Sequence, residues 1–279
     1  MGSSCIPRLQ KRDRPGEGDG PGSPGFKGES ALAAEARWSA AVEFVEHVER
    51  AYAGLMAMAA ANRETGLGGK LLYAGELDAA GRALMVAAHI AGAASLAATA
   101  EGAEQKQAVR DGVSDFLVNS LDEALRILKN QLRKRETVAV CVGFAPEAVE
   151  REMRERGVEP DLVREEIDGV GGEGIAESGG DSGSALVMWS VAAAPAQWLP
   201  KLDALAMECL PEDAWRERRW LRMAPRYLGR LTQGLRLLRC DEASADRFVQ
   251  RVREQAANGE IRVAVDVKVR NGPDKGIAC

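Results

Sequence analysis

The sequence is short of histidine, of paired cysteines and of aromatic rings. Its only histidines are His47 and His89, its 5 cysteines are scattered without a CxxC pair, and Phe, Trp and Tyr together make up 5% of its 279 residues. Zinc sites of the ordinary type need several Cys or His ligands at close spacing, so we predict no metal site. An odd, dispersed set of thiols is typical of reduced cytoplasmic proteins, and we expect that compartment.

Long hydrophobic runs and a basic excess are missing as well. The longest apolar stretch, residues 83–98, contains His89 and is shorter than a membrane span, and no apolar targeting segment stands at the start, so we expect no membrane partner. The formal net charge of −5 disfavours nucleic acid as a partner. No Ser/His/Asp or Cys/His set can be assembled, and Cys141 falls inside an expected core strand, so the catalytic residues are unknown.

Shifts in composition divide the chain. Residues 1–29 are rich in Gly, Pro and Ser and predict a disordered tail, because such a segment buries too little apolar surface to fold. Residues 164–184 are acidic and glycine-rich and predict a linker. We therefore expect a first folded domain over residues 30–163 and a second over residues 185–279.

The first domain shows an α/β pattern. Short apolar runs alternate with amphipathic segments, and we expect strands at residues 70–74, 93–98, 115–118, 137–143 and 161–163. Strands and helices alternating at this spacing predict right-handed βαβ units in a Rossmann-like, doubly wound parallel sheet. Ser120 followed by Glu123 is a capping box that begins one of the helices.

Helices dominate the flanking segments. Apolar residues at helical spacing predict a long helix over residues 30–62, whose stripe either packs on the sheet or forms a homodimer seam. In the second domain we expect a strand at 185–191, helices at 197–209, 213–240 and 244–257, and a strictly alternating strand at 261–269. The first and last of these strands should share a small sheet, which makes this a smaller C-terminal α+β region.

One of these helices carries a stripe of arginines. Arg218, Arg222, Arg226 and Arg230 are spaced four apart and so fall along one helical face. The stripe could bind phosphates or an acidic protein. The alternative that we favour is a solvated face that pairs with neighbouring carboxylates.

Several segments resemble a known family. Residues 69–75 (Gly-Lys-Leu-Leu-Tyr-Ala-Gly), 91–97, 120–125 and 156–163 are similar, in the family's order, to the Rossmann-like domain of urocanase (urocanate hydratase). The resemblance covers about the middle third of the chain. It implies a domain that holds NAD⁺ tightly, as in histidine catabolism. There the nicotinamide acts as an electrophile that adds to the imidazole of urocanate, so that water can enter the side chain.

The resemblance also implies candidate cofactor-binding residues. Gly75 and Gly81 lie where a nucleotide turn needs them, Asp78 stands between them, and the residue expected to bond the ribose falls at Thr99. The family has a run of glycines where this chain has Glu76, Asp78 and Arg82, so negative charge lies where a diphosphate would bind. The flanking urocanase domains, with the catalytic cysteine, have no counterpart here.

These observations leave several functions open. The first is a stand-alone, divergent urocanase-like Rossmann-domain protein that lacks urocanate hydratase activity and binds a nucleotide or serves in assembly or regulation. The second is a urocanate hydratase-like lyase that uses NAD together with a partner. The third is a binder of an acidic protein or nucleic acid through the arginine stripe.

Overall fold

The computed structural model describes residues 31–58, 61–167, 184–229, 231–232 and 234–271. The expected tail at 1–29, most of the expected linker and Arg230 lie outside the described residues. Residues 1–37 and 38–279 form separate compact units, and of the first only a helical stretch from residue 31 is described. No helix in the described part of the chain has the length and hydrophobicity needed to cross a membrane.

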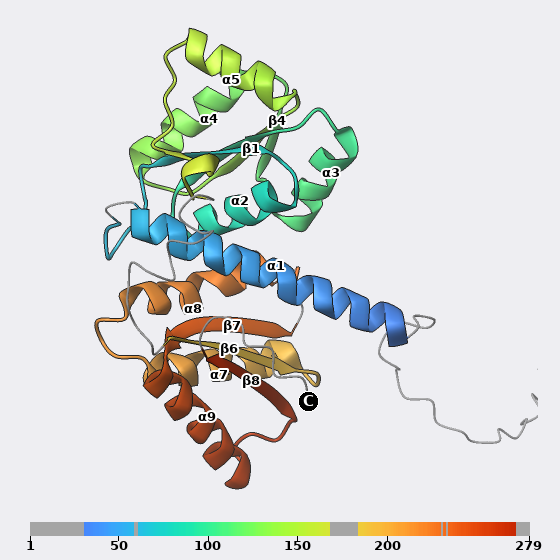
Figure 1. Cartoon of the computed structure of the whole chain (residues 1–279), viewed down its shortest axis with the longest axis vertical. Coiled ribbons are helices and arrows are strands. Elements are labelled where there is room, and N and C mark those ends of the chain that lie inside the picture. The colour runs from blue at the N-terminus through green and yellow to red at the C-terminus, as the bar shows by residue number, and fades with distance from the viewer. Residues whose placement is uncertain (1–30, 59–60, 168–183, 230, 233, 272–279) are drawn as a thin grey trace, which may run out of the picture. The chain divides into compact units, whose positions relative to one another are not determined.

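A parallel sheet forms the first layer of the second unit (Figure 1). Its strands and helices follow one another as β1 (Leu71–Glu76), α2 (Ala79–Ala91), β2 (Ala94–Ala98), α3 (Gly102–Asp111), β3 (Phe116–Val118), α4 (Leu121–Lys134), β4 (Ala139–Val142), α5 (Pro146–Glu155) and β5 (Leu162–Val163). All five strands are parallel, in the order β3-β4-β2-β1-β5. The predicted α/β, Rossmann-like fold is therefore confirmed.

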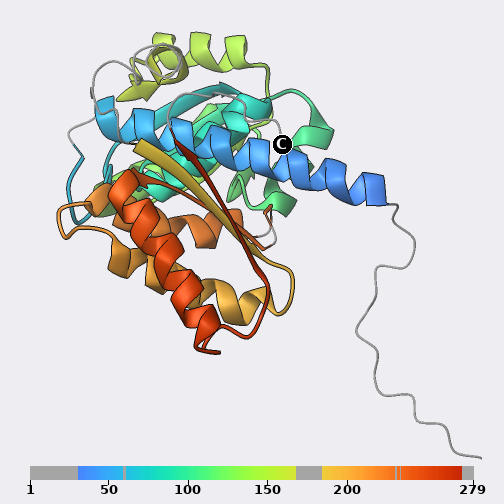
Figure 2. The same cartoon turned by 60° about the horizontal axis from the view of Figure 1, so that its bottom comes forward.

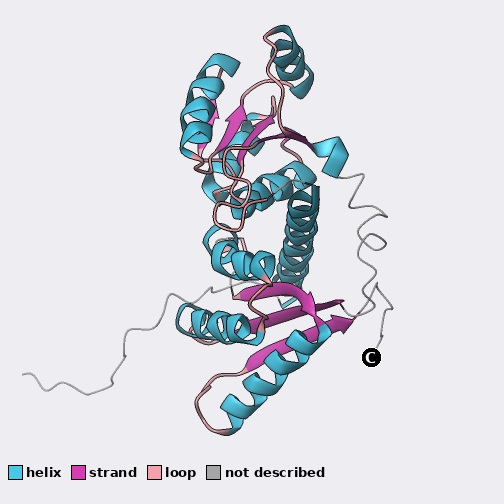
Figure 3. Ribbon diagram, turned by 90° about the vertical axis from the view of Figure 1, so that its left-hand side faces the viewer, coloured by secondary structure: helices cyan, strands magenta, loops and turns pink. Residues whose placement is uncertain are grey.

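Helices cover both faces of this sheet (Figure 3). Side chains alternate along each strand, so neighbouring residues of one strand pack against helices on opposite faces. Leu72 and Ala74 of β1 belong to the same buried cluster as α2, whereas Leu71 and Tyr73 pack with α4 and α5 on the other face. Helix α2 is rich in alanine and buried on almost every side, so it lies in the interior rather than on the surface.

A second, antiparallel sheet follows. Its elements are β6 (Ser184–Val191), α7 (Pro195–Cys209), α8 (Trp215–Leu228), β7 (Leu235–Asp241), α9 (Glu242–Ala257) and β8 (Val265–Asn271), and the strand order is β7-β6-β8 (Figure 2). The expected pairing of the first and last strands is confirmed, since β6 and β8 are neighbours.

Two sequence-based expectations are wrong in this region. The strand expected over residues 261–269 begins only at Val265 and runs to Asn271. The helix expected over residues 213–240 ends at Leu228, and residues 235–241 form strand β7 instead. The chain leaves α8 at Gly229 and turns again at Gly234, whose φ of +82° lies in the left-handed region that glycine adopts readily.

The long helix α1 (Ala31–Met58) is buried where its apolar stripe runs. Val45, Val48, Tyr52, Leu55 and Met56 lie in the chain's own core, whereas residues 38–40 are exposed. A homodimer through this helix stays a prediction, and in the second unit the stripe itself is already covered.

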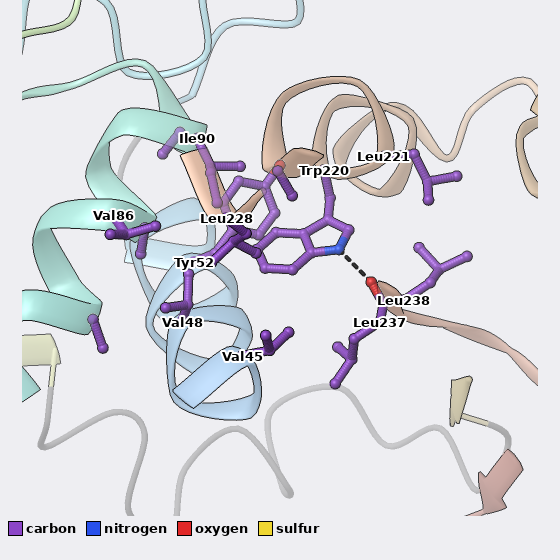
Figure 4. Packing of buried hydrophobic residues seen from close by; sticks show 14 of the residues in the cluster. Val45, Val48, Tyr52, Val86, Ile90, Trp220, Leu221, Leu228, Leu237 and Leu238 are labelled. Atoms are coloured by element: carbon purple, nitrogen blue, oxygen red, sulfur yellow. Dashed lines mark hydrogen bonds between the residues drawn. The ribbon is translucent and has the colours of Figure 1, made fainter. Parts of the chain in front are cut away.

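Helix α8 packs against α2 and β7, so the two sheets share one hydrophobic cluster (Figure 4). Trp220 of α8 tilts against Tyr52 of α1 with ring centroids 5.2 Å apart, and its indole Nε1 donates to the carbonyl of Leu237, 2.6 Å away. Val86 and Ile90 of α2 belong to the same cluster. This cluster contains residues from both predicted domains, 30–163 and 185–279, and the division into two domains stays a prediction.

Candidate functional site

The candidate site lies at the carboxyl ends of the parallel strands. Strand β1 has β2 on one side and β5 on the other. The chain runs from β1 to β2 on the first side, and after β4 it crosses to β5 on the second side, so the direction in which strands are added reverses at β1. Ligands of such sheets bind at this topological switch point. The residues that meet there are the β1–α2 turn and the residue that follows β5, which is Arg164.

Asp78 occupies the N-terminus of α2. Its Oδ1 accepts a hydrogen bond from the backbone N–H of Gly81 at 2.7 Å. Arg164 donates from Nη1 to Oδ1 at 3.0 Å and from Nη2 to Oδ2 at 3.1 Å, so the guanidinium grips both carboxylate oxygens. Burial raises the pKa of Asp78, but the hydrogen bonds from Gly81 and Arg164 outweigh it and hold that pKa below its ordinary value. The helix end therefore carries a charged carboxylate of the chain itself.

The fold itself requires glycine at both predicted turn positions. Gly75 has a φ of +68°, in the left-handed region. A Cβ on Gly81 would lie 2.0 Å from the carbonyl oxygen of Glu76, which means that α2 approaches the end of β1 too closely for any side chain. Both glycines are thus explained by the backbone whether or not a cofactor binds.

Thr99 lies directly after β2 and is buried. Its hydroxyl accepts from the N–H of Glu101 at 3.3 Å, and its carbonyl accepts from Nε2 of Gln105 at 2.8 Å. These contacts position the start of α3. The Thr99 side chain therefore supports the loop that leads into α3.

Arg82 does not serve this edge of the sheet. It forms ion pairs with Asp111 and with Glu104 of α3, the latter at 3.7 Å, and its side chain is largely buried. The cation beside Asp78 is Arg164, which sequence reasoning did not single out. It lies 86 residues from Asp78 in the chain, and only the adjacency of β5 and β1 brings the two together.

These residues do not fit the diphosphate of a dinucleotide. A diphosphate at a helix N-terminus needs the amides that Asp78 accepts from, and it would meet the negative charge of Asp78 and Glu76 there. The cofactor roles of Gly75, Asp78, Gly81 and Thr99 therefore stay predictions, and so does NAD as the cofactor.

In the described chain, Cys141 and His89 are both buried. Cys141 is buried in β4, and burial, with the charge of Glu76, raises the pKa of its thiol to about 11. His89 is buried, 3.1 Å from Asp115, and stacked on Tyr227 with ring centroids 4.7 Å apart. Within the described ranges no cluster of His, Cys, Asp and Glu has the arrangement of a metal site.

The arginine stripe is not a uniform surface. Arg218 donates to the carbonyls of Leu210 and Pro211 at 2.8 and 3.0 Å, while Arg222 and Arg226 are exposed. The interleaved Arg219 is buried against α2. The stripe is therefore partly structural, and its outward charge in the described chain comes from Arg222 and Arg226.

Comparison with known families gives one match. Residues 48–167 match the family model of the urocanase Rossmann-like domain. The matched stretch begins within α1 and includes every strand of the parallel sheet. This confirms the resemblance inferred from the sequence motifs. The antiparallel sheet and α7–α9 lie outside the match.

Proposed function

We propose that this chain is a urocanase-like Rossmann-domain protein that works without NAD, has no urocanate hydratase activity and acts as a regulatory, non-catalytic protein. One observation carries the proposal. The carboxylate of Asp78 already occupies the helix N-terminus at the switch point and is held there by Arg164.

The physical argument concerns competition for the same amides. The first N–H groups of α2 and the positive end of its dipole stabilise whichever anion lies there. Asp78 is covalently part of the helix and loses no translational entropy when it binds these amides, whereas a free dinucleotide loses translational entropy when it binds. A diphosphate must also displace the Arg164 contact or leave Asp78 beside its own negative charge.

The burial of three cysteine thiols supports a non-catalytic function. Among the described cysteines, Cys141, Cys209 and Cys240 are all buried as free thiols, and burial raises the pKa of each. A thiol with a raised pKa is a poor nucleophile at neutral pH. None of these three thiols therefore takes a catalytic role in this proposal.

Native mass spectrometry and calorimetric titration with NAD⁺ test the proposal. We expect no retained NAD and no binding heat at millimolar NAD⁺, and no urocanate turnover with or without it. Asp78→Gly should gain measurable NAD⁺ binding because it frees the amides of α2 and the guanidinium of Arg164. The matched control is Asp122→Gly in the first turn of α4, which removes a carboxylate from a different helix end and should gain nothing.

Either of two results would overturn it. Purified wild-type protein that retains NAD, or binds it at micromolar concentration, shows that the turn accommodates a diphosphate despite Asp78. The function as an NAD-dependent urocanate hydratase-like lyase is then favoured, and turnover of urocanate by the NAD complex would establish that function.

A further inference from the structure

Strand β8 is one of the two edge strands of the antiparallel sheet, the other being β7. It pairs with β6 from Val265 opposite Val191 to Asn271 opposite Ala185. Among the described residues, no other backbone hydrogen bond reaches β8. One side of the strand therefore presents a row of unpaired N–H and C=O groups, which is a template for pairing with another strand.

The apolar face of β8 is incompletely covered. Val265, Val267 and Val269 stand opposite Val191, Trp189 and Val187 of β6, and residues directly opposite share a face. The three β6 side chains are at most 3% exposed, whereas Val269 is 38% exposed and its two neighbours on β8 are half-buried. Apolar cover on this face thus runs out at the edge strand.

The opposite face of β8 carries charges of both signs. Asp266 and Lys268 are exposed and lie 3.6 Å apart along the strand, while Arg270 pairs with Glu46 of α1. The pattern at the centre of the strand is therefore Asp266, Val267, Lys268. The negative charge of Asp266 and the positive charge of Lys268 are each one residue away from Val267.

We propose that β8 pairs antiparallel with β8 of a second copy of this chain, about a two-fold axis that passes through Val267. In this register Asp266 stands opposite Lys268 of the second copy, and Lys268 opposite its Asp266. Val265 stands opposite Val269, so the half-exposed valines of each strand cover those of the other. The two sheets then continue into one another with their apolar faces on the same side.

The charges select this register over its neighbours. A slip of one residue would place charged residues opposite valines. The apolar face of one strand would then lie on the same side of the joined sheet as the charged face of the other. Moving the axis to residue 266 would oppose Asp266 to itself, and moving it to residue 268 would oppose Lys268 to itself. Like charges directly opposite one another are destabilising.

The interface is also closed. A two-fold pairing uses the same edge in both copies, so it ends at a dimer and leaves neither β8 free. It does not involve the switch point of the parallel sheet, so it is independent of the proposed function.

Sedimentation of the full chain over a range of concentrations tests the pairing. We expect a monomer–dimer equilibrium in the wild-type chain. Asp266→Lys and Lys268→Asp each create two like-charge contacts across the axis and should each weaken the dimer by about tenfold or more. The double variant, with both substitutions, restores opposite charges and should return to wild-type affinity. Lys129→Asp on the exposed side of α4 makes the same charge change elsewhere and should leave the dimer unchanged.

Cross-linking tests the register separately. Val267→Cys should form an intermolecular disulfide under mild oxidation beyond the wild-type level, because residue 267 faces itself across the axis. Val269→Cys faces residue 265 instead and should not. A wild-type chain that stays monomeric at hundred-micromolar concentration (on the order of the weakest specific dimers) overturns the proposal. So does a dimer that is indifferent to the single charge reversals, or a double variant that fails to recover.

Discussion

Arg219 of α8 donates a hydrogen bond from Nε to the carbonyl oxygen of Ile90, 3.0 Å away, in the last turn of α2. Its Nη1 also lies 3.4 Å from the carbonyl of Glu64. The residue is 6% exposed, and a Cβ on Gly92 would lie 2.5 Å from Nη2. A buried cation at the C-terminal end of a helix is stabilised by unpaired carbonyls and by the helix dipole. Arg219 therefore anchors α8 to a helix of the urocanase-like segment.

Replacing this anchor should destabilise the protein. Arg219→Met keeps much of the apolar stem but leaves the carbonyls at the end of α2 without their donor, and we expect a loss of about 2–3 kcal/mol in the free energy of unfolding. Urea unfolding measures it. Arg222→Met, one turn away and exposed, is the control and should change stability by less than about 0.5 kcal/mol. Equal effects of the two changes would contradict the anchoring role.

Gly81 should tolerate no side chain. In Gly81→Ala the new Cβ meets the carbonyl of Glu76 at 2.0 Å, so α2 must move from β1, and we expect a loss of about 3 kcal/mol. Gly102→Ala at the start of α3 meets nothing within 4 Å and should stabilise by up to about 1 kcal/mol. Thermal unfolding of the pair reports the sign of each change. A neutral Gly81→Ala would show that the turn relaxes freely.

The ion pair between Glu49 and Arg239 predicts an asymmetric result. Arg239 donates to both Glu49 oxygens at 2.8 to 3.1 Å, but the Glu49 side chain is 6% exposed and that of Arg239 is 40% exposed. Arg239→Met leaves a buried carboxylate unpaired and should cost about 3–5 kcal/mol. Glu49→Met leaves a cation that water can reach, so its cost should be smaller, about 1 kcal/mol. Urea unfolding that ranks the two the other way round would refute this account.

Acid should unfold the protein through its paired aspartates. Burial raises the pKa of Asp78 and of Asp161, yet hydrogen bonds from Gly81 and Arg164, and from Lys70 and Leu71, hold both below the ordinary value. Because their folded pKa is lower than the unfolded one, at about 3.9, the stability they contribute is fully present above that pH. It is lost as the pH falls through the folded pKa.

The substitution Asp78→Asn isolates one part of this effect. It removes the titration, so the fall in unfolding free energy below about pH 4 should become shallower than in the wild-type chain. Denaturant unfolding at a series of pH values gives the slope. Asp246→Asn on the exposed side of α9 makes the same substitution away from this contact and is the matched control. An unchanged slope in Asp78→Asn would count against the Arg164 contact.

Local chemistry explains why much of the fold could be predicted. Ser120 accepts from the N–H of Glu123 at 3.2 Å, as its spacing in the sequence indicates, and α4 begins there. The apolar run that ends near Ala74 becomes β1, and Gly75 takes a positive φ just where the turn was expected. Each of these depends on residues that are neighbours in the chain.

Features that depend on distant residues could not be predicted in this way. Strand β7 is rich in leucine and arginine, which favour helix, and it is held as a strand by pairing with β6. The contact between Asp78 and Arg164 needs β5 beside β1, and the local pattern of each strand does not show its neighbours in the sheet. The sequence showed Asp78 in the turn after β1, but it did not show that Arg164 would pair with it.

The core shared by α2 and α8 also bears on how this protein could be inherited and recombined. The family match ends at residue 167, but Val86 and Ile90 inside it belong to the same buried cluster as Trp220 and Leu228 outside it. A gene rearrangement that carried only the matched segment would expose this apolar face to water, at a cost of roughly 25 cal/mol for each Å² uncovered. Selection should therefore keep the matched segment and residues 184–271 together as one inherited unit.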